Sequence, residues 1–398
     1  MVYVGLNGFG RIGKSIFLQL LNHKTLKIKA INVTKFDLEN LASYLENDST
    51  HYYKKDWILK IIDETTFSIN GEIIHMFSER DAGQLNWKKY DNIEYVIDCT
   101  GAYLTQDACK KHNVEYVVIC APPKDNSPQF VVNVNEEKYN GENIVSNASC
   151  TTNCITPVLG FLEKKYKIEK ANFTTIHATT ASQNTIDTNH FNNRTSRSII
   201  NNIIPHSTGA SKSIKALIPS LDGKVKGTSL RVPVNNVSII DLNVTLSKNV
   251  KIEELMDEME KSGYILINKR KLVSSDFNTT TMPSIVDKDA SMQLTDNEYK
   301  LLIWYDNEWS YSAQVIRLTE HMAKYNYETN NHIHRNFITN YNFQNREVII
   351  RVDWNIPYNK LDYSINDDFR IVSSLKTIKY ILEQSPERVI IVSHLGRP

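Results

Sequence analysis

Short stretches of alternating apolar and polar residues recur along the first third of the chain, and each predicts a β-strand. They lie at residues 2–7, 27–33, 94–98 and 115–119, and the intervals between them are long enough for helices. The segment IGKSIFLQLL at 12–21 has its apolar residues at helical spacing. Strands that alternate with helices are typical of a doubly wound parallel sheet, so an α/β fold is predicted here.

The first predicted strand leads into a glycine-rich turn. Gly8, Gly10 and Gly13 have the spacing GxGxxG, in which the glycines permit a tight turn, close approach of a pyrophosphate and packing of the helix on the strand. The same spacing occurs in ordinary glycine turns. Its position between a strand and a helix favours a Rossmann-type domain for NAD or NADP over residues 1–149.

One feature of such a domain is missing at the end of the second predicted strand. A carboxylate about 20 residues beyond the glycines normally binds the adenosine ribose and excludes a 2′-phosphate. This position holds Val33, preceded by Asn32. Asp37 follows closely but is more typical of a solvated helix start. The sequence therefore leaves open whether the cofactor is NAD or NADP.

The stretch SNASCTTNC at 146–154 places two thiols four residues apart after a predicted strand. Cys150 falls at the expected start of a helix, where free N–H groups and the helix dipole lower the pKa of a thiol. Cys154 lies one turn deeper and is expected to pack. An isolated cysteine is usually buried and inert, but His177, at the end of a β-rich run, is a candidate base or ion-pair partner for Cys150.

Composition limits the remaining classes of function. The 398 residues are enough for about two to three domains, and 41% hydrophobic with 23% charged residues is typical of a folded protein. A net charge of +1 gives no reason to expect a nucleic-acid or membrane partner. The five cysteines lack metal-ligand spacing, and neither a leader nor a membrane-spanning run is visible, so we expect a metal-free cytoplasmic protein.

Longer motifs connect these features to a known family. In order, they are LNGFGRIGK, DCTGAYLT, CAPPKD, SNASCTTNC, HATTASQNTID, NNIIPHSTGASK, RVPVNNVSIIDL and IWYDNEWSYS. From Val2 to about Tyr325 the chain resembles glyceraldehyde-3-phosphate dehydrogenases. The resemblance implies a Rossmann domain, an α+β catalytic domain at 150–310, and a helix at 311–325 that packs back on the first domain. It also implies a homotetramer, with loops 181–203 close to the neighbouring cofactor site.

The resemblance implies a covalent mechanism. Cys150 would attack the aldehyde of glyceraldehyde 3-phosphate, and His177 would pair with the thiolate and then take the hydroxyl proton as hydride leaves. Inorganic phosphate would release 1,3-bisphosphoglycerate from the resulting thioester. The residues implied for the two phosphate groups are Ser149, Thr151, Thr180, Arg197, Thr208, Gly209 and Arg231. Those implied for the cofactor are Gly8, Gly10, Arg11, Ile12, Gly13, Asn32, Thr100, Gly101, Cys120, Asn307 and Tyr311.

Some of these residues have simpler explanations, and the chain departs from the family pattern in places. Arg231 alone could be a surface strand residue, and Asn307 a turn residue. Cys120 stands where the family usually has serine or threonine, and Tyr52 and Ser310 replace glycines. An erythrose-4-phosphate dehydrogenase and an inactive binding paralogue are the alternative functions.

The sequence changes character after Tyr325. Residues 326–345 are polar and rich in asparagine, which predicts a linker. REVIIRVDWNIP and RVIIVSHLGRP then read as strands on either side of a helix, FRIVSSLKTIKYILEQS, and together predict a βαβ unit at 346–398.

This last segment resembles the beginning of a phosphoglycerate kinase, through RVDWNIP and SHLGRP. Asp353, Asn355, Arg370, His394 and Arg397 would fall at that family's 3-phosphoglycerate positions. The remainder of that family's sequence is not among these residues, so kinase activity is not expected from the segment alone. The sequence suggests a fusion of two consecutive glycolytic enzymes, the second truncated.

Overall fold

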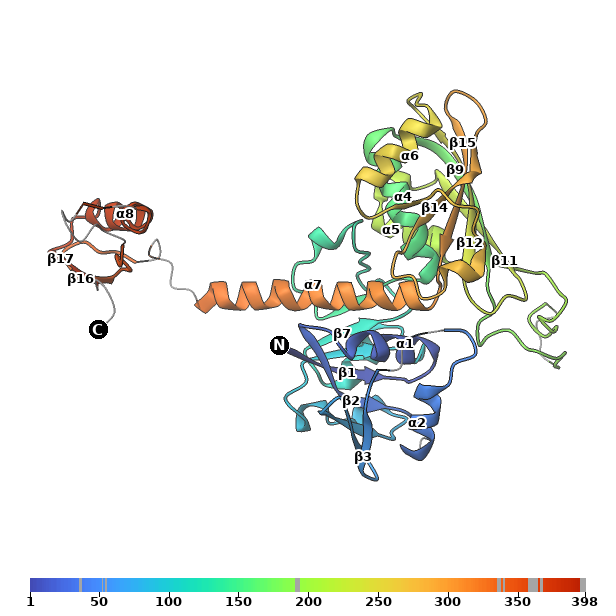
Figure 1. The fold of residues 1–398 in the computed structure, drawn as a ribbon, viewed down its shortest axis with the longest axis horizontal. Helices are drawn as coiled ribbons and strands as arrows, with labels where there is room; N and C mark the ends of the chain where they lie inside the picture. The colour runs from blue at the N-terminus through green and yellow to red at the C-terminus, as the bar shows by residue number, and fades with distance from the viewer. Residues whose placement is uncertain are drawn as a thin grey trace. The chain divides into compact units, whose positions relative to one another are not determined.

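A computed structural model describes the chain apart from residues 36–37, 52, 54–55, 190–193, 335–337, 339–340, 357–363, 366–367 and 394–398. Asp37, Tyr52, His394 and Arg397, which the sequence singled out, lie outside the described residues. The chain forms two compact units, Met1–Tyr325 and Asn326–Pro398. Figure 1 shows the ribbon with many of its helices and strands labelled.

The first sheet has eight strands in the order β3-β4-β5-β2-β1-β6-β7-β8. Its strands are β1 (Val2–Asn7), β2 (Leu26–Asn32), β3 (Leu59–Asp63), β4 (Thr66–Ile69), β5 (Glu72–Phe77), β6 (Tyr95–Asp98), β7 (Tyr116–Ile119) and β8 (Ile144–Ser146). The six strands from β5 to β8 are parallel, and β3 and β4 add an antiparallel edge. The predicted doubly wound α/β arrangement is confirmed, with every predicted strand present.

The helices of this part are α1 (Arg11–Leu20), α2 (Leu38–Glu46) and α3 (Gln106–Cys109). Helix α1 begins directly after the glycine turn, as the sequence predicted. Gly8 has a φ of +91°, and a Cβ at Gly13 would lie 2.2 Å from the Gly8 carbonyl oxygen. These two positions therefore require glycine, one for the turn and one for the packing of α1 on β1.

The second sheet has seven strands in the order β10-β11-β9-β12-β15-β14-β13. Its strands are β9 (Ile168–His177), β10 (Ile204–His206), β11 (Val225–Arg231), β12 (Ser238–Leu246), β13 (Leu266–Asn268), β14 (Ile285–Gln293) and β15 (Glu298–Tyr305). Helices α4 (Cys150–Lys165), α5 (Ala210–Leu217) and α6 (Ile252–Lys261) accompany it. Apolar residues of this sheet and of α4 form one buried cluster, which fixes α4 against the strands.

Helix α7 (Trp309–His334) follows the second sheet and packs its buried face on the first sheet. Val315, Leu318 and Met322 are fully buried in the same apolar cluster as Leu6 and Ile31 of the first sheet. The helix extends nine residues beyond Tyr325, so residues 326–334 of the segment predicted as a linker are helical. No glycine or proline interrupts the chain between Trp309 and Asn345, and a polar surface helix then needs no apolar periodicity to continue.

The second unit contains a parallel pair of strands, β16 (Glu347–Arg351) and β17 (Arg388–Val392), joined through helix α8 (Phe369–Leu382). This is the predicted βαβ arrangement. Ile378 and Ile381 of α8 are buried, whereas the Ile349 side chain of β16 is 71% exposed. A single helix can cover only one face of a two-stranded sheet. Apolar side chains on the other face therefore remain in contact with water.

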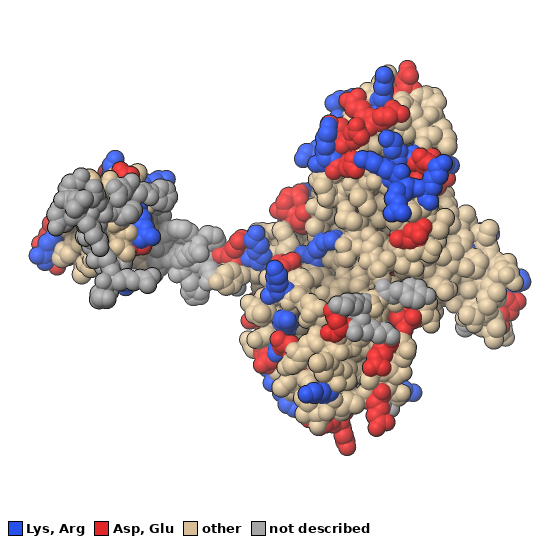
Figure 2. All heavy atoms as spheres, in the orientation of Figure 1, with Lys and Arg blue, Asp and Glu red and all other residues tan. Residues whose placement is uncertain are grey.

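Charged side chains of both signs are interspersed on the face of the molecule drawn in Figure 2. This mixture agrees with the net charge of +1. Within the described residues, no helix combines the length and apolar character needed to cross a bilayer.

Candidate active site

Cys150 is held at the first turn of α4 by an unusual turn after β8. Ala148 has a φ of 52°, a conformation that non-glycine residues rarely adopt. Its carbonyl oxygen accepts a hydrogen bond from the Tyr311 hydroxyl at 3.1 Å, and its N–H donates to Ser146 Oγ. Ser149 caps the helix by accepting from the Thr152 N–H at 3.1 Å. Such strain occurs at functional sites, where the surrounding contacts hold it in place.

His177 faces Cys150 from the end of β9. Its Nε2 lies 3.4 Å from Cys150 Sγ, and its Nδ1 lies 2.7 Å from the Ala178 carbonyl oxygen. Nδ1 also lies 2.8 Å from Arg231 Nη1, which can only donate, so the Ala178 carbonyl favours a protonated Nδ1 and Arg231 an unprotonated one. In either tautomer, Nε2 is the ring nitrogen that faces the thiol. This is the arrangement required for a nucleophile and its base.

Arg231 completes the charged surroundings of this pair. It is opposite His177 in the parallel register of β11 and β9. Its Nη1 lies 2.8 Å from His177 Nδ1 and donates to the Ala178 carbonyl oxygen at 3.1 Å. The guanidinium thus contacts both the imidazole and the carbonyl oxygen beside it.

Burial and Arg231 together set the protonation of the pair. Burial raises the pKa of the Cys150 thiol, and this outweighs the opposing effects of the Arg231 charge and the Thr151 N–H. Burial, then Arg231, lowers the pKa of His177 to about 3. The sequence predicted that the start of the helix lowers the pKa of Cys150. This lowering is present, but it is smaller than the rise caused by burial. Without a ligand, the site thus holds a neutral thiol beside a neutral imidazole.

Asn307, two residues after the end of β15, presents its amide nitrogen to the same cavity. Its Oδ1 accepts from the Ser238 hydroxyl at 2.8 Å, and Ser238 Oγ in turn accepts from the Ala178 N–H at 3.0 Å. Asn307 Nδ2 is buried and has no hydrogen-bond partner among the described residues. A buried donor without a partner at a cavity wall is suited to a ligand carbonyl or amide.

Two cavities meet at Gly10. The larger, of about 680 Å³, is lined by Cys150, His177 and Asn307. The smaller, of about 420 Å³, lies beyond the glycine turn and is lined by Val33, Lys35 and Arg80, among others. Gly10 contributes to both. The glycine turn, where a pyrophosphate would bind, thus borders both the cavity of the Cys150–His177 pair and a second pocket of nucleoside size.

The structure brings most of the predicted residues to these cavities. The larger cavity includes Gly10, Arg11, Ile12, Gly101, Cys120, Ser149, Cys150, Thr180, His177, Arg231, Asn307 and Tyr311. The smaller includes Gly8, Gly10, Asn32 and Thr100. Gly13 lies behind the turn against Gly8.

Four predicted phosphate-binding residues are not part of the larger cavity's lining. Arg197 forms an exposed ion pair with Asp187 at 3.0 Å. The Thr151 hydroxyl lies 3.0 Å from the Tyr305 hydroxyl in the interior. Thr208 and Gly209 lie at the start of α5, where Thr208 Oγ1 accepts from the Ala210 N–H.

Asn32 is also engaged within the protein. Its Nδ2 donates to Asn7 Oδ1 at 2.7 Å and to the Glu79 carbonyl oxygen at 2.8 Å, and its Oδ1 accepts from the Glu79 N–H. The side chain thus shapes the smaller cavity by fixing the backbone of Glu79.

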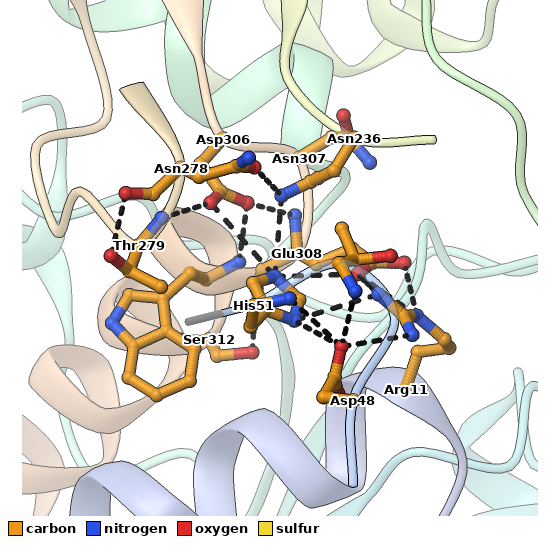
Figure 3. A network of polar contacts seen from close by, with 12 residues as sticks. Arg11, Asp48, His51, Asn236, Asn278, Thr279, Asp306, Asn307, Glu308 and Ser312 are labelled. Carbon is orange, nitrogen blue, oxygen red and sulfur yellow. Dashed lines mark hydrogen bonds and ion pairs between the residues drawn. The ribbon is translucent and has the colours of Figure 1, made fainter. Parts of the chain in front are cut away.

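A polar network connects Arg11, directly after the glycine turn, to Asp306 and Glu308 on either side of Asn307, as Figure 3 shows. Arg11 Nε donates to both carboxylate oxygens of Glu308 at 2.9 and 3.0 Å. The Asp48 carboxylate accepts from the His51 N–H at 2.8 Å and lies 3.0 Å from Lys14 Nζ. Burial opposes ionisation of Asp48, but these hydrogen bonds and charges outweigh it and lower its pKa to about 2. The network joins α1, the loop after α2 and the start of α7.

Sequence reasoning did not identify Ser238, Asp48 or His51 as parts of the site. Ser238 lies 69 residues from Asn307 along the chain, and His51 lies in a segment without a helical or strand pattern. The motif RVPVNNVSIIDL contains Ser238, and a hydroxyl in an otherwise apolar run was the available signal.

In the second unit, three of the five predicted kinase-like positions are described, and they lie together. Arg370 Nη1 donates to Asp353 Oδ2 and to the Asn355 carbonyl oxygen, both at 2.9 Å. The side chains of Arg370 and Asp353 are 50% and 60% exposed.

Among the described residues, no group of three or more histidine, cysteine or acidic side chains is arranged to hold a metal ion. A Rossmann-type sheet whose glycine turn lines the same cavity as a thiol–imidazole pair defines the class of dinucleotide-dependent dehydrogenases.

Comparison with known proteins narrows this class. Residues 2–106 match the family model "Glyceraldehyde 3-phosphate dehydrogenase, NAD binding domain", and residues 149–307 match the C-terminal domain of the same family. The chain belongs to the glyceraldehyde-3-phosphate dehydrogenase family. Residues 338–398 match the phosphoglycerate kinase family model, so the resemblance of both segments is confirmed.

Curated relatives agree over the whole first part. The cytosolic glyceraldehyde-3-phosphate dehydrogenase of Leishmania mexicana is 40% identical over 333 residues, which is 81% of this chain and 99% of that protein. Glyceraldehyde-3-phosphate dehydrogenase 1 of Kluyveromyces lactis is 39% identical over 81% of this chain and 100% of its own length. The glyceraldehyde-3-phosphate dehydrogenase of Salmonella typhimurium is 39% identical over 81% of this chain and 99% of its own length.

Proposed function

We propose that the chain is a phosphorylating glyceraldehyde-3-phosphate dehydrogenase of glycolysis, followed by a segment of the phosphoglycerate kinase family at 338–398. The observation that carries the proposal is the 3.4 Å contact between Cys150 Sγ and His177 Nε2 in a cavity that continues past the glycine turn. Family membership supplies the substrate class.

In the proposed reaction, Cys150 Sγ attacks the aldehyde carbon of glyceraldehyde 3-phosphate. The thiol proton passes through His177 Nε2 to the carbonyl oxygen, which gives a hemithioacetal. His177 then takes the hydroxyl proton as hydride leaves the carbon, and a Cys150 thioester remains. Attack by inorganic phosphate breaks the carbon–sulfur bond and releases 1,3-bisphosphoglycerate with the thiolate.

The roles of the cavity residues follow from their donors. Arg231 and Thr180 are proposed to bind the substrate phosphate, because a guanidinium and a hydroxyl both donate to phosphate oxygens. Ser149, with Thr151, Thr208 and Gly209, is proposed for the attacking phosphate. Engagement of Thr208 or of Arg197 would require local rearrangement of the loops that carry them.

The residues present fit a nicotinamide dinucleotide. The unpaired Asn307 Nδ2 is proposed to donate to the carboxamide, and Gly8 and Gly10 to border the pyrophosphate. The cofactor supplies a hydride acceptor when bound. NAD is the proposed cofactor, and NADP is the alternative. Position 33 holds valine in place of the carboxylate that excludes a 2′-phosphate, and Lys35 and Arg80 line the same pocket, together with Glu79.

We further propose a cytoplasmic homotetramer, in keeping with the family and with five cysteines that are all free. Kinase activity is not proposed for the C-terminal segment, because its match to the phosphoglycerate kinase family is confined to residues 338–398. Its exposed Ile349 and Ile391 are side chains that a larger kinase domain would cover.

The test is the initial rate of nicotinamide reduction by the purified chain with glyceraldehyde 3-phosphate, with and without phosphate, and with NAD or NADP. We expect phosphate-dependent turnover that the substitution Cys150→Ser abolishes. Faster turnover with erythrose 4-phosphate would favour the alternative dehydrogenase. Absence of turnover from a folded protein would favour an inactive binding paralogue.

A further inference from the structure

Two thiols lie side by side at the ends of neighbouring strands. Cys99 follows β6 and Cys120 follows β7, and the register of these parallel strands pairs the preceding residues, Asp98 with Ile119. The Cys120 N–H donates to the Asp98 carbonyl oxygen at 2.9 Å, so the pairing continues to the cysteines. Their Sγ atoms are 3.5 Å apart. Both side chains therefore leave the sheet on the same face.

The pair forms part of the proposed cofactor cavity. Cys99 and Cys120 line the same cavity as Gly10 and Cys150, and both are partly exposed. Small reactants that enter the cavity can reach them. Cys109 and Cys154, in contrast, are buried.

The geometry is close to that of a disulfide. Neighbouring strands lie about 4.8 Å apart, which is within the range of about 4.4–6.8 Å between the Cα atoms of bonded cysteines. The Sγ atoms must approach from 3.5 Å to about 2.0 Å. Rotation of the two side chains can supply that movement without displacement of the strands.

The two sulfurs have different surroundings. Cys99 Sγ is placed to donate a hydrogen bond to Cys120 Sγ. Burial, together with Cys120, raises the pKa of the Cys99 thiol, so Cys99 remains protonated at neutral pH. Cys120 receives the hydrogen bond and is the sulfur better suited to react first.

We propose that Cys99 and Cys120 are an oxidisable dithiol, which hydrogen peroxide converts to a disulfide in the wall of the cofactor cavity. The location in a cofactor cavity rests on the proposed function. Cys120 Sγ attacks one peroxide oxygen, the O–O bond breaks, and a sulfenic acid and water form. Cys99 Sγ then attacks the Cys120 sulfur, and the hydroxyl leaves with the Cys99 proton as a second water. Two thiols lose two electrons and peroxide gains them.

Cofactor binding and oxidation should oppose each other. A bound dinucleotide covers the cavity wall and keeps peroxide from Cys120, and the cross-link moves both sulfurs from the positions that shape this wall. Because coupling between two binding events is reciprocal, the oxidised protein should bind the dinucleotide more weakly.

The test uses the full chain with Cys150→Ser, so that the catalytic thiol cannot react. The protein is treated with hydrogen peroxide, unfolded in iodoacetamide and digested with trypsin without reduction. Mass spectrometry should detect residues 90–110 linked to residues 112–124, with Cys109 alkylated. Saturating NAD should slow the formation of this product about tenfold, and dithiothreitol should reverse it.

Two further variants serve as controls in the same background. Cys109→Ser removes the other thiol of peptide 90–110 and should leave the cross-link intact, whereas Cys120→Ser should eliminate it. The proposal is overturned if Cys99 and Cys120 both remain alkylatable, or if Cys120 oxidises to a sulfinic acid while Cys99 stays free. Equal rates with and without NAD would overturn the coupling to the cofactor. The readout is a thiol cross-link, so it does not depend on turnover.

Discussion

Ser238 donates a hydrogen bond to Asn307 Oδ1 at 2.8 Å while its oxygen accepts from the Ala178 N–H. A serine hydroxyl has a single proton, so this contact fixes which end of the Asn307 amide faces the cavity. It also connects Asn307 to the residue whose carbonyl oxygen orients His177. Ser238 is therefore a positioning residue for both the proposed cofactor amide and the base.

The substitution Ser238→Ala tests this role. Without the hydroxyl, the Asn307 amide can rotate and the Ala178 N–H loses its acceptor, so we expect about a tenfold loss in kcat/KM, mostly as a raised KM for the dinucleotide. The matched control is Ser247→Ala, at an exposed position just beyond the end of β12. An unchanged KM for NAD in Ser238→Ala, with normal folding, would contradict the role.

Arg231 should control how readily Cys150 ionises. Its charge lowers the pKa of the Cys150 thiol, so Arg231→Gln should shift the pH dependence of iodoacetamide inactivation to higher pH. Arg231→Lys retains the charge and should shift it less. The measurement is the second-order inactivation rate between pH 6 and 10, under conditions where only one thiol reacts. A profile that is the same in Arg231→Gln and the parent would refute this effect.

Asp48 should contribute stability that depends on pH. Its pKa is about 2 in the folded protein, below its ordinary value, so the contribution is fully present above about pH 4 and is lost as the pH falls towards 2. We expect Asp48→Asn to destabilise the fold by about 1–2 kcal/mol at pH 7, and the difference to narrow below pH 4.

Thermal unfolding midpoints of the parent and of Asp48→Asn, measured from pH 7 to pH 3, test this expectation. Asp289→Asn is a suitable control, because the Asp289 side chain is 57% exposed. A difference in midpoint that stays constant down to pH 3 would show that ionisation of Asp48 is not its source.

The C-terminal segment should be dispensable for the dehydrogenase. Every residue that lines the two cavities lies in the unit Met1–Tyr325. A chain that ends at Asn345 keeps all of these residues, so its kcat/KM should stay within about twofold of the value for the full chain. A twofold change corresponds to less than about 0.5 kcal/mol in the activation free energy. A loss of activity in a truncated chain that remains folded would indicate that residues 346–398 support the site.

Local patterns predicted much of this molecule. The glycine turn with β1, α1 and β2 follows from short-range periodicity, and Cys150 at the start of α4 follows from its motif. His177 was chosen as a chemically required partner, although 27 residues separate it from Cys150.

The remainder depended on contacts between distant segments. The hydrogen bond from Arg11 to Glu308 joins residues 297 positions apart. Burial and the helix start shift the pKa of Cys150 in opposite directions, and only the folded structure shows that burial is the larger effect. Helix α7 also extends beyond Tyr325, where the helix predicted at 311–325 ends. The polar segment that follows contains no helix breaker, so the sequence has no local signal for the end of the helix.

The central claim is that Cys150 carries the acyl group between oxidation and phosphate attack. The most direct measurement is the intact mass of the protein after rapid acid quench, when it is mixed with NAD and glyceraldehyde 3-phosphate in phosphate-free buffer. We predict one added 3-phosphoglyceroyl group per chain. Peptide mapping should locate it on Cys150, and phosphate added before the quench should release it. Nicotinamide reduction without any adduct, or an adduct on another residue, would contradict the account.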